Sequence, residues 1–293
     1  MKDEILQYKI TPGKSVNLKK FATTYKGDLE KESGKMEMED VKLQLNKSQE
    51  KLYASNTHSV LVIFQAMDAA GKDSAIEHVM SGLNPQGCQV YNFKVPTSEE
   101  YEHDFLWRHY RALPERGRIG IHNRSHYENV LVCKVHPEYI LNENIPGYND
   151  VDAVNKDFWA KRYQSIRSFE QHLSDNGTTV IKIFLHLSKE EQKQRFLDRI
   201  NDPEKNWKFA AGDLEERKVW NKYQSAYEEA LYETSTNDCP WYVIPADKKW
   251  YARLVISKII NNKLKELKLE FPVLDKKDAS NLSSYKAQLL AEK

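Results

Sequence analysis

The chain has 293 residues, of which 40% are hydrophobic and 30% are charged, so it can bury a sizeable core beneath a well-solvated surface. Lysine and arginine together number 44 and the acidic residues 43, which gives a formal net charge of +1. This balance argues against a protein that coats nucleic acid, because such proteins carry a strongly basic domain. A site for a polyanion must therefore be a local concentration of charge.

Neither a secretory signal nor a membrane span is predicted. The start, MKDEILQYKI, has no apolar core like that of a signal peptide, and no apolar run approaches the roughly 20 residues of a membrane helix. Cys88, Cys133 and Cys239 are widely separated, so we expect buried thiols in a cytoplasmic protein. His122 and His126 straddle a predicted strand–helix junction, and a metal site there is not favoured.

Strands alternate with helices along most of the chain. Residues 1–55 are polar and lysine-rich and are predicted to form an N-terminal helical extension, with a helix over 37–53 and with the first 20 residues either packed or partly disordered. Strands are expected at 59–66, 88–93, 118–122, 178–187 and 241–245. Helices are expected at 72–81, 98–113, 125–134, 150–175, 189–200, 213–234 and 247–267. This order predicts an α/β fold with a mainly parallel sheet in one domain over 56–270, followed by a tail over 271–293.

The loop between the first strand and its helix has the sequence AMDAAGKD, residues 66–73. After a buried strand, the backbone N–H groups of such a loop and the following helix N-terminus point at a bound anion. Gly71 allows close backbone approach, and Lys72 places a cation between neighbouring phosphates. The residues expected to bind phosphate here are Ala69, Ala70, Gly71, Lys72, Asp73 and Ser74.

Two positions depart from the usual G-x-x-x-x-G-K-[ST] pattern. Ala66 occupies the first glycine position, and Asp73 stands where a metal-binding hydroxyl is expected. Asp68 is a carboxylate inside a predicted anion cradle, which suggests that a cation such as Mg²⁺ lies between it and the phosphates. The alternative is an ordinary strand-to-helix turn with a capping aspartate.

Several blocks of the sequence, in one order, resemble the type-2 polyphosphate kinase family. They include FQAMDAAGKD at 64–73, HVMSG at 78–82, NPQG at 84–87, FK at 93–94, HDFLWR at 103–108 and LPERG at 113–117. The likeness continues through NRS at 123–125 and VHP at 135–137 to PWYVIPAD at 240–247, and it covers about 52–260. So many ordered blocks are far more specific than a phosphate loop alone.

The resemblance implies a P-loop kinase fold like that of thymidylate kinase, with a parallel five-stranded sheet and a mobile helical lid. It also implies Mg²⁺-dependent phosphoryl transfer between polyphosphate and nucleotides, with Asp68 and Lys72 matching the family's loop aspartate and lysine. Asn123 stands where many relatives carry aspartate, which resembles the class III branch that phosphorylates both AMP and ADP. Glu128 would then supply the missing carboxylate.

A second set of candidate residues follows the third predicted strand, which ends at the same sheet edge as the phosphate loop. The predicted catalytic residues are Asp68, Lys72, Asn123, Arg124 and Glu128, with Asp68 as the metal ligand. Arg124 suits a forked contact with an acceptor phosphate, although pairing with Glu128 at i,i+4 is the alternative. The resemblance places Lys94, Asp104 and Arg108 in the nucleotide pocket, with an Asp104–Arg108 surface ion pair as the alternative.

Residues 188–220 occupy the position of the family's lid. Ser188 and Glu191 form a capping-box pattern, so a helix is expected to start near Lys189. The cations predicted to bind the phosphate chain are Arg195, Arg199, Lys205 and Lys208. A solvated helix face, with Glu191 paired to Arg195, is the alternative.

The sequence therefore predicts a polyphosphate-dependent kinase that converts AMP to ADP and ADP to ATP with Mg²⁺. The expected partners are polyphosphate, adenine (or guanine) nucleotides and further copies of the chain, with no nucleic acid and no membrane. An ATP-dependent nucleoside monophosphate kinase and a non-catalytic nucleotide sensor are the alternatives.

Overall fold

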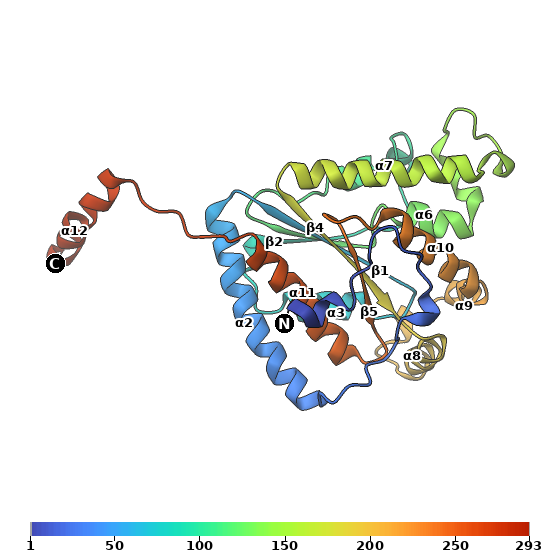
Figure 1. The fold of residues 1–293 in the computed structure, drawn as a ribbon, viewed down its shortest axis with the longest axis horizontal. Coiled ribbons are helices and arrows are strands. Elements are labelled where there is room, and N and C mark those ends of the chain that lie inside the picture. Colours follow the sequence, from blue (N-terminus) through green and yellow to red (C-terminus); the bar gives the residue numbers. More distant parts are fainter. Residues whose placement is uncertain (1, 293) are drawn as a thin grey trace.

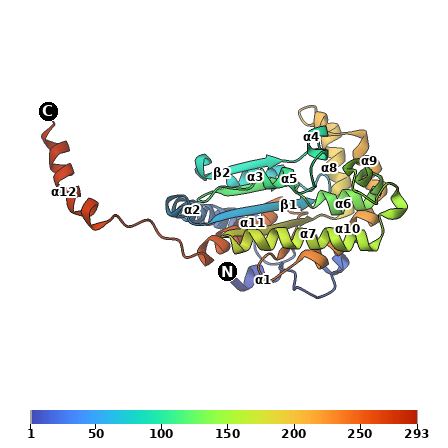
Figure 2. The same cartoon turned by 90° about the horizontal axis from the view of Figure 1, so that it is seen from above.

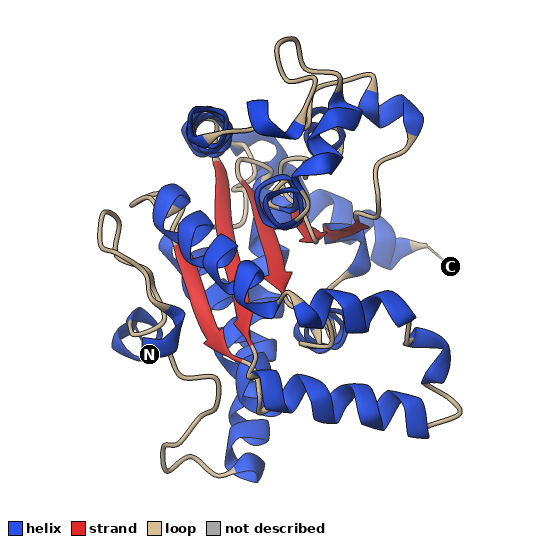
Figure 3. Ribbon diagram, turned by 90° about the vertical axis from the view of Figure 1, so that its right-hand side faces the viewer, coloured by secondary structure: helices blue, strands red, loops and turns tan. Residues whose placement is uncertain are grey.

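The computed structural model describes residues 2–292 and contains a sheet of five parallel strands with the order β2-β3-β1-β4-β5. The strands are β1 (Ser59–Ala66), β2 (Cys88–Asn92), β3 (Ile119–Asn123), β4 (Thr178–His186) and β5 (Trp241–Pro245). The sheet lies between two layers of helices (Figure 1; Figure 3). The predicted fold class is confirmed.

The helices connect these strands in the expected order. They are α1 (Lys2–Leu6), α2 (Lys31–Ser55), α3 (Lys72–Met80), α4 (Ser98–Tyr101), α5 (Trp107–Tyr110), α6 (Glu128–Val135), α7 (Lys156–Asp175), α8 (Lys189–Asn201), α9 (Ala211–Lys218), α10 (Trp220–Thr234), α11 (Lys249–Glu266) and α12 (Lys276–Ala291). Short 3-10 helices lie at η1 (Leu18–Lys20), η2 (Pro85–Gly87), η3 (Pro137–Glu143), η4 (Val151–Ala153) and η5 (Asn206–Lys208). Within residues 2–292, no helix is both long and apolar enough to cross a membrane.

Alternate residues of the buried strands face opposite sides of the sheet. Leu61 and Ile63 of β1 belong to a core shared with α6, α7 and α10. Val60 and Val62 belong to a second core shared with α2, α3 and α11. Figure 1 shows α7 and α11 on opposite sides of the sheet, and in Figure 2, seen from above, α7 runs roughly parallel to β1. Burial on both faces explains why these strands are continuous apolar runs.

The N-terminal segment runs along the outer edge of β5. The N–H of Ile10 donates to the carbonyl of Trp241 at 2.8 Å, and the N–H of Val243 donates to the carbonyl of Tyr8 at 2.8 Å. Ile5, Ile10 and Leu18 are buried. Of the two alternatives for the first 20 residues, the structure therefore shows packing against the domain.

Two predicted helices are each divided in two. The expected helix over 98–113 is wrong as a single element, because Asp104 accepts a hydrogen bond from the N–H of Leu106 and forms a turn between α4 and α5. The expected helix over 213–234 is broken at Val219, which lets Trp220 turn into the core while α9 has no buried residue. At the other end of the chain, α12 stands away from the body on an extended linker (Figure 1). The predicted domain and lid limits stay predictions.

Candidate active site

The loop after β1 positions Lys72 at the first turn of α3. Gly71 has φ +94°, a left-handed conformation that favours glycine, and it precedes the helix as its N-cap. Ala69 also has a left-handed backbone, with φ +61°, which costs a non-glycine residue about 1–2 kcal/mol. The Lys72 Nζ donates to the carbonyl of Ala66 at 3.0 Å, so the side chain folds back over the loop.

The loop after β3 meets this cradle because β1 and β3 are parallel neighbours, with Phe64 paired to Asn123 in the register. Asn123 Nδ2 donates to Asp73 Oδ1 at 2.6 Å. The residue after it, Arg124, has φ +64°, a second left-handed non-glycine residue. Such backbone strain concentrates at functional sites, where the surrounding structure holds it in place.

Arg124 lies between two carboxylates. Its Nη2 is 3.3 Å from Asp68 Oδ1, and its Nη1 is 3.7 Å from Glu128 Oε2. The negative charge of Glu128 is the largest of the effects that raise the pKa of Arg124. The i,i+4 pair considered from the sequence is thus present, and Arg124 also reaches across to the phosphate loop. The structure brings all five predicted catalytic residues to one edge of the sheet.

The site holds its lysine in a region of low solvent access. Burial, and secondly the nearby Arg124, lowers the pKa of Lys72. A bound phosphate would offset both effects, because a negative charge favours the ammonium form. Lys72 is therefore placed to bind an anion that the protein itself does not supply.

The charges of Asp68 and Glu128 also shift the pKa values of groups on α9 and α10. Burial and then the charge of Asp68 raise the pKa of Asp213, a residue of α9. Burial, followed by Glu128 and Asp68, raises the pKa of Tyr227 well above its usual value. Within the described residues, no group of three or more His, Cys, Asp or Glu side chains could hold a metal ion alone. One or two carboxylates completed by substrate phosphates is, however, the arrangement that Mg²⁺ commonly uses.

A cavity of about 310 Å³ opens beside Arg124 at the ends of β2 and β3. Its lining includes Phe93, Lys94, Arg108, Arg124 and Tyr139. The guanidinium of Arg108 lies 5.1 Å from the centre of the Phe93 ring and 3.2 Å from Glu100. Aromatic rings beside cations suit a nucleotide, whose base stacks and whose phosphates need positive charge.

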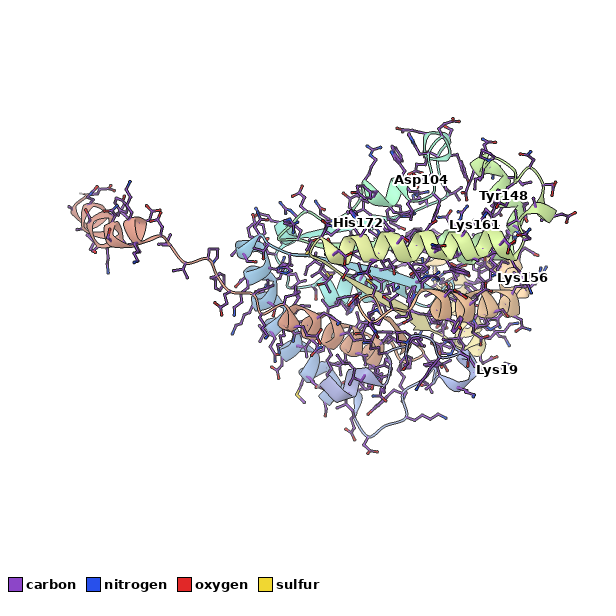
Figure 4. The ribbon with its side chains drawn as sticks, turned by 45° about the horizontal axis from the view of Figure 1, so that its top comes forward. Lys19, Asp104, Tyr148, Lys156, Lys161 and His172 are labelled. Atoms are coloured by element: carbon purple, nitrogen blue, oxygen red, sulfur yellow. The ribbon has the colours of Figure 1, made fainter. Side chains whose placement is uncertain are left out.

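Asp104 lies outside this cavity, which is called the acceptor cavity below because the sequence predicted the nucleotide pocket there. It lines a separate cavity of about 480 Å³ with Tyr148 and Lys161 (Figure 4). The ion pair with Arg108 considered from the sequence is wrong, because the helix that would align them is broken and Arg108 pairs with Glu100 instead. Of the three residues expected in the nucleotide pocket, Lys94 and Arg108 line the acceptor cavity.

Arg195 is buried, and all of its hydrogen bonds go to the protein. Its Nη1 donates to the carbonyls of Ala69 and Ala70 at 3.1 and 2.8 Å. Its Nη2 donates to the carbonyls of Ala246 and Asp247 at 2.7 and 3.0 Å, and its Nε donates to Glu191 at 2.8 Å. This geometry argues against the expected contact with phosphate, and against a solvated helix face, because Arg195 is only 5% exposed. It indicates that Arg195 positions the phosphate loop.

These features coincide with a known family of kinases. A family model described as Polyphosphate kinase 2 (PPK2) matches residues 28–272. The chain belongs to this family. The family and the fold class are those that the sequence predicted.

Proteins that are named for an enzymatic activity resemble the chain along almost its whole length. An ADP-polyphosphate phosphotransferase from Rhodopseudomonas palustris is 50% identical over 99% of this chain and 100% of the relative. An AMP/ADP-polyphosphate phosphotransferase from Meiothermus ruber is 43% identical over 91% of this chain and 95% of the relative. The crystal structure of Polyphosphate Kinase 2 from Arthrobacter aurescens has a TM-score of 0.85 and 36% identity, covering 98% of this chain and 96% of that one.

The other expected lid cations of this PPK2 chain lie farther out. Arg199 Nη1 is 3.9 Å from Asp213 Oδ2, with the arginine side chain 26% exposed. Lys205 pairs with Asp202, and Lys208 lies 5.0 Å from the ring centre of Trp207, which is 74% exposed. In this structure Arg199 is therefore the expected lid cation that is both near the carboxylates and accessible, and its contact with phosphate stays a prediction.

Sequence reasoning missed Gln192, which fastens α8 to the phosphate loop. Its Nε2 donates to the carbonyl of Asp68 at 3.0 Å, and its Oε1 accepts from Arg217 at 2.9 Å. Gln192 and Arg195 are three residues apart, so both lie on the helix face that meets the loop. That spacing was a signal available in the sequence.

Proposed function

We propose that this PPK2 protein transfers the terminal phosphoryl group of polyphosphate to ADP and AMP, in a reversible reaction with Mg²⁺. The observation that carries the proposal is that one sheet edge joins a phosphate loop with a half-buried lysine to an arginine-lined acceptor cavity. The relatives from R. palustris and M. ruber are named as polyphosphate phosphotransferases, which supports polyphosphate as the donor.

Lys72 and the backbone N–H groups of its loop would bind the terminal phosphate of the donor. Arg124 lies between this loop and the acceptor cavity, so it is placed to contact both the transferred and the accepting phosphate. The second pKa of a phosphate monoester is about 6, so the accepting oxygen is already ionised at neutral pH. The chain needs no strong general base, and positioning with charge neutralisation carries the catalysis.

Asp68 is the residue best placed to ligate Mg²⁺, with Glu128 on the other side of Arg124. When bound, the metal would neutralise charge on the transferred phosphoryl group. Asn123 adds no charge at this point, and its amide is held by Asp73 at 2.6 Å. A neutral residue here repels the extra negative charge of ADP less than an aspartate would. We therefore propose ADP as well as AMP as acceptors.

The decisive experiment compares donors. The purified protein is given AMP or ADP with either polyphosphate or ATP as the phosphoryl donor, and nucleotide products are separated by chromatography. We expect ADP and then ATP from AMP and polyphosphate. Turnover of AMP with ATP alone would establish a nucleoside monophosphate kinase instead, and binding without turnover would establish a sensor.

A matched pair of variants ties the activity to the site. Asp68→Asn removes a charge without changing size and should reduce kcat at least a hundredfold, with a circular dichroism spectrum like that of the parent. Asp150→Asn makes the same chemical change at an exposed cap of η4, and its kcat should be unchanged. Normal turnover by Asp68→Asn would remove Asp68 from the proposed metal site.

A further inference from the structure

The largest cavity described, about 920 Å³, lies away from the acceptor cavity. Its walls come from the segment 18–27, from the ends of β4 and β5 at His186 and Pro245, and from α10. A volume of this size is in the range of ligand sites. The proposed reaction assigns it no role so far.

The outer wall of this cavity is held in a defined position. The N–H of Leu18 donates to Glu228 Oε1 at 2.7 Å, and the Leu18 carbonyl lies 3.1 Å from His186 Nε2. The N–H of Asp247 donates to the carbonyl of Thr23 at 2.9 Å. Segment 18–27 is therefore tied to β4, α10 and the loop after β5, and the cavity is a built feature of the fold.

The lining is rich in positive charge that the protein does not neutralise. Lys19, Lys26 and Lys189 line the cavity, against the single carboxylate of Glu228, which is held by the Leu18 N–H. Among residues 4–292, no carboxylate forms an ion pair with any of these three lysines. Gln224 also lines the cavity, and its Nε2 has no hydrogen-bond partner among the described residues. Free donors and cations of this kind suit a polyanion.

The position of the cavity relative to the phosphate loop indicates which ligand could reach it. In an in-line transfer, the attacking and leaving oxygens lie on opposite sides of the phosphorus atom. The acceptor cavity is at the β2 and β3 side of β1, so the leaving chain departs toward β4 and β5. The cavity lies at that side, because the ends of β4 and β5 at His186 and Pro245 form part of its wall.

Helix α8 links the two places over a short distance. Ser188 and Lys189, at the start of α8, line the cavity, while Gln192 contacts the carbonyl of Asp68. Four residues of helix rise by only about 6 Å. A chain of phosphates that leaves the loop on this side would have to pass the start of α8 to reach the cavity.

We propose that this cavity is a distal subsite for the polyphosphate chain, with Lys19, Lys26 and Lys189 as its contacts. This rests on the proposed function, because it assumes that polyphosphate is the donor bound at the loop. It makes long chains better donors than short ones, since only long chains reach the lysines. Exposed lysine–phosphate contacts are each worth a factor of about two to five.

The test uses the triple variant Lys19→Gln, Lys26→Gln, Lys189→Gln in the full-length protein. Its control is Lys47→Gln, Lys276→Gln, Lys277→Gln, which makes the same charge change at exposed lysines away from the described cavities. We expect the KM for long-chain polyphosphate to rise about tenfold at low salt, and less at high salt, in the first variant only. The kcat, the KM for ADP and the KM for short oligophosphates should stay within about twofold of the parent.

An unchanged KM for long chains overturns the proposal, and so does an equal rise for short and long chains. A second nucleotide site is a different outcome: the variant would then lose one equivalent of bound ADP in equilibrium dialysis while its KM for polyphosphate is unchanged. Direct binding of long polyphosphate to the parent and both variants separates this proposal from the reaction itself. If the parent shows no polyphosphate-dependent turnover, the proposed function fails, and equal binding by all three proteins overturns the subsite.

Discussion

Replacing Arg195 by methionine should damage both stability and catalysis. Methionine keeps the length and apolar stem of the side chain but removes every donor of the guanidinium. Four backbone carbonyls, two in the phosphate loop and two after β5, would then lose their charged partner. Hydrogen bonds to charged groups contribute about 1.5–3 kcal/mol each, but neighbouring losses do not add.

We therefore expect Arg195→Met to lower the free energy of unfolding by about 3–5 kcal/mol, the usual cost of breaking a buried charged contact. The kcat should fall at least tenfold, because Arg195 no longer donates to the carbonyls of Ala69 and Ala70 and so no longer holds the loop in its strained conformation. The effect should depend little on salt, since buried interactions are weakly screened. Urea unfolding and steady-state kinetics at two salt concentrations measure these quantities.

Arg199→Met is the matched control on the same helix. Its guanidinium is partly exposed and 3.9 Å from Asp213, so the unfolding free energy should change by less than about 1 kcal/mol. If Arg199 contacts the donor, its loss raises the KM for polyphosphate in a salt-dependent way. The reasoning about Arg195 is refuted if Arg195→Met unfolds like the parent and changes only the KM for polyphosphate.

Three further outcomes are expected. Lys72→Met should reduce kcat at least a hundredfold with an unchanged circular dichroism spectrum, and near-normal turnover would exclude Lys72 from the cradle. Lys182→Met should lower the unfolding free energy by about 3–5 kcal/mol, because it leaves Glu170 charged and fully buried; a double change with Glu170→Leu should recover part of this loss in urea unfolding. Burial lowers the pKa of His122 from 6.5 to about 4, so the unfolded state binds more protons between these values. The free energy of unfolding should therefore fall by about 3 kcal/mol as the pH is lowered from 6.5 to 4. In a plot of unfolding free energy against pH, His122→Gln should make this part of the curve flatter.

Local patterns were sufficient to predict the sheet and the loop. The first strand is an apolar run rich in β-branched residues, and the parallel pairing of β1 with β3 brings Asn123 beside the phosphate loop. Asp68, Lys72 and Arg124 could be proposed because they lie in or at the end of the segments after two strands, and because the resemblance to the family implied their roles. Residues that act from other elements, such as Gln192 and Asp213, could be placed only once the packing of α8 and α9 was known.

The role of Arg195 shows why sequence spacing was insufficient. An arginine four residues from Glu191 fits both an exposed ion pair and a lid contact, and the sequence cannot count the carbonyls that surround it. Likewise, the break at Asp104 depends on one side chain accepting the N–H of Leu106, where helix propensity favours continuation. In both places a polar side chain bonds to the backbone of a non-helical segment, which sequence spacing does not predict.

The packing of residues 8–10 along β5 bears on how the protein can be shortened. The family model begins at residue 28, so a chain trimmed to 28–272 would lose the segment that pairs with Trp241 and Val243. An outer strand without that partner offers free N–H and C=O groups to other molecules, which promotes edge-to-edge aggregation. The smallest unit that stays monodisperse should therefore begin well before the region that identifies the family.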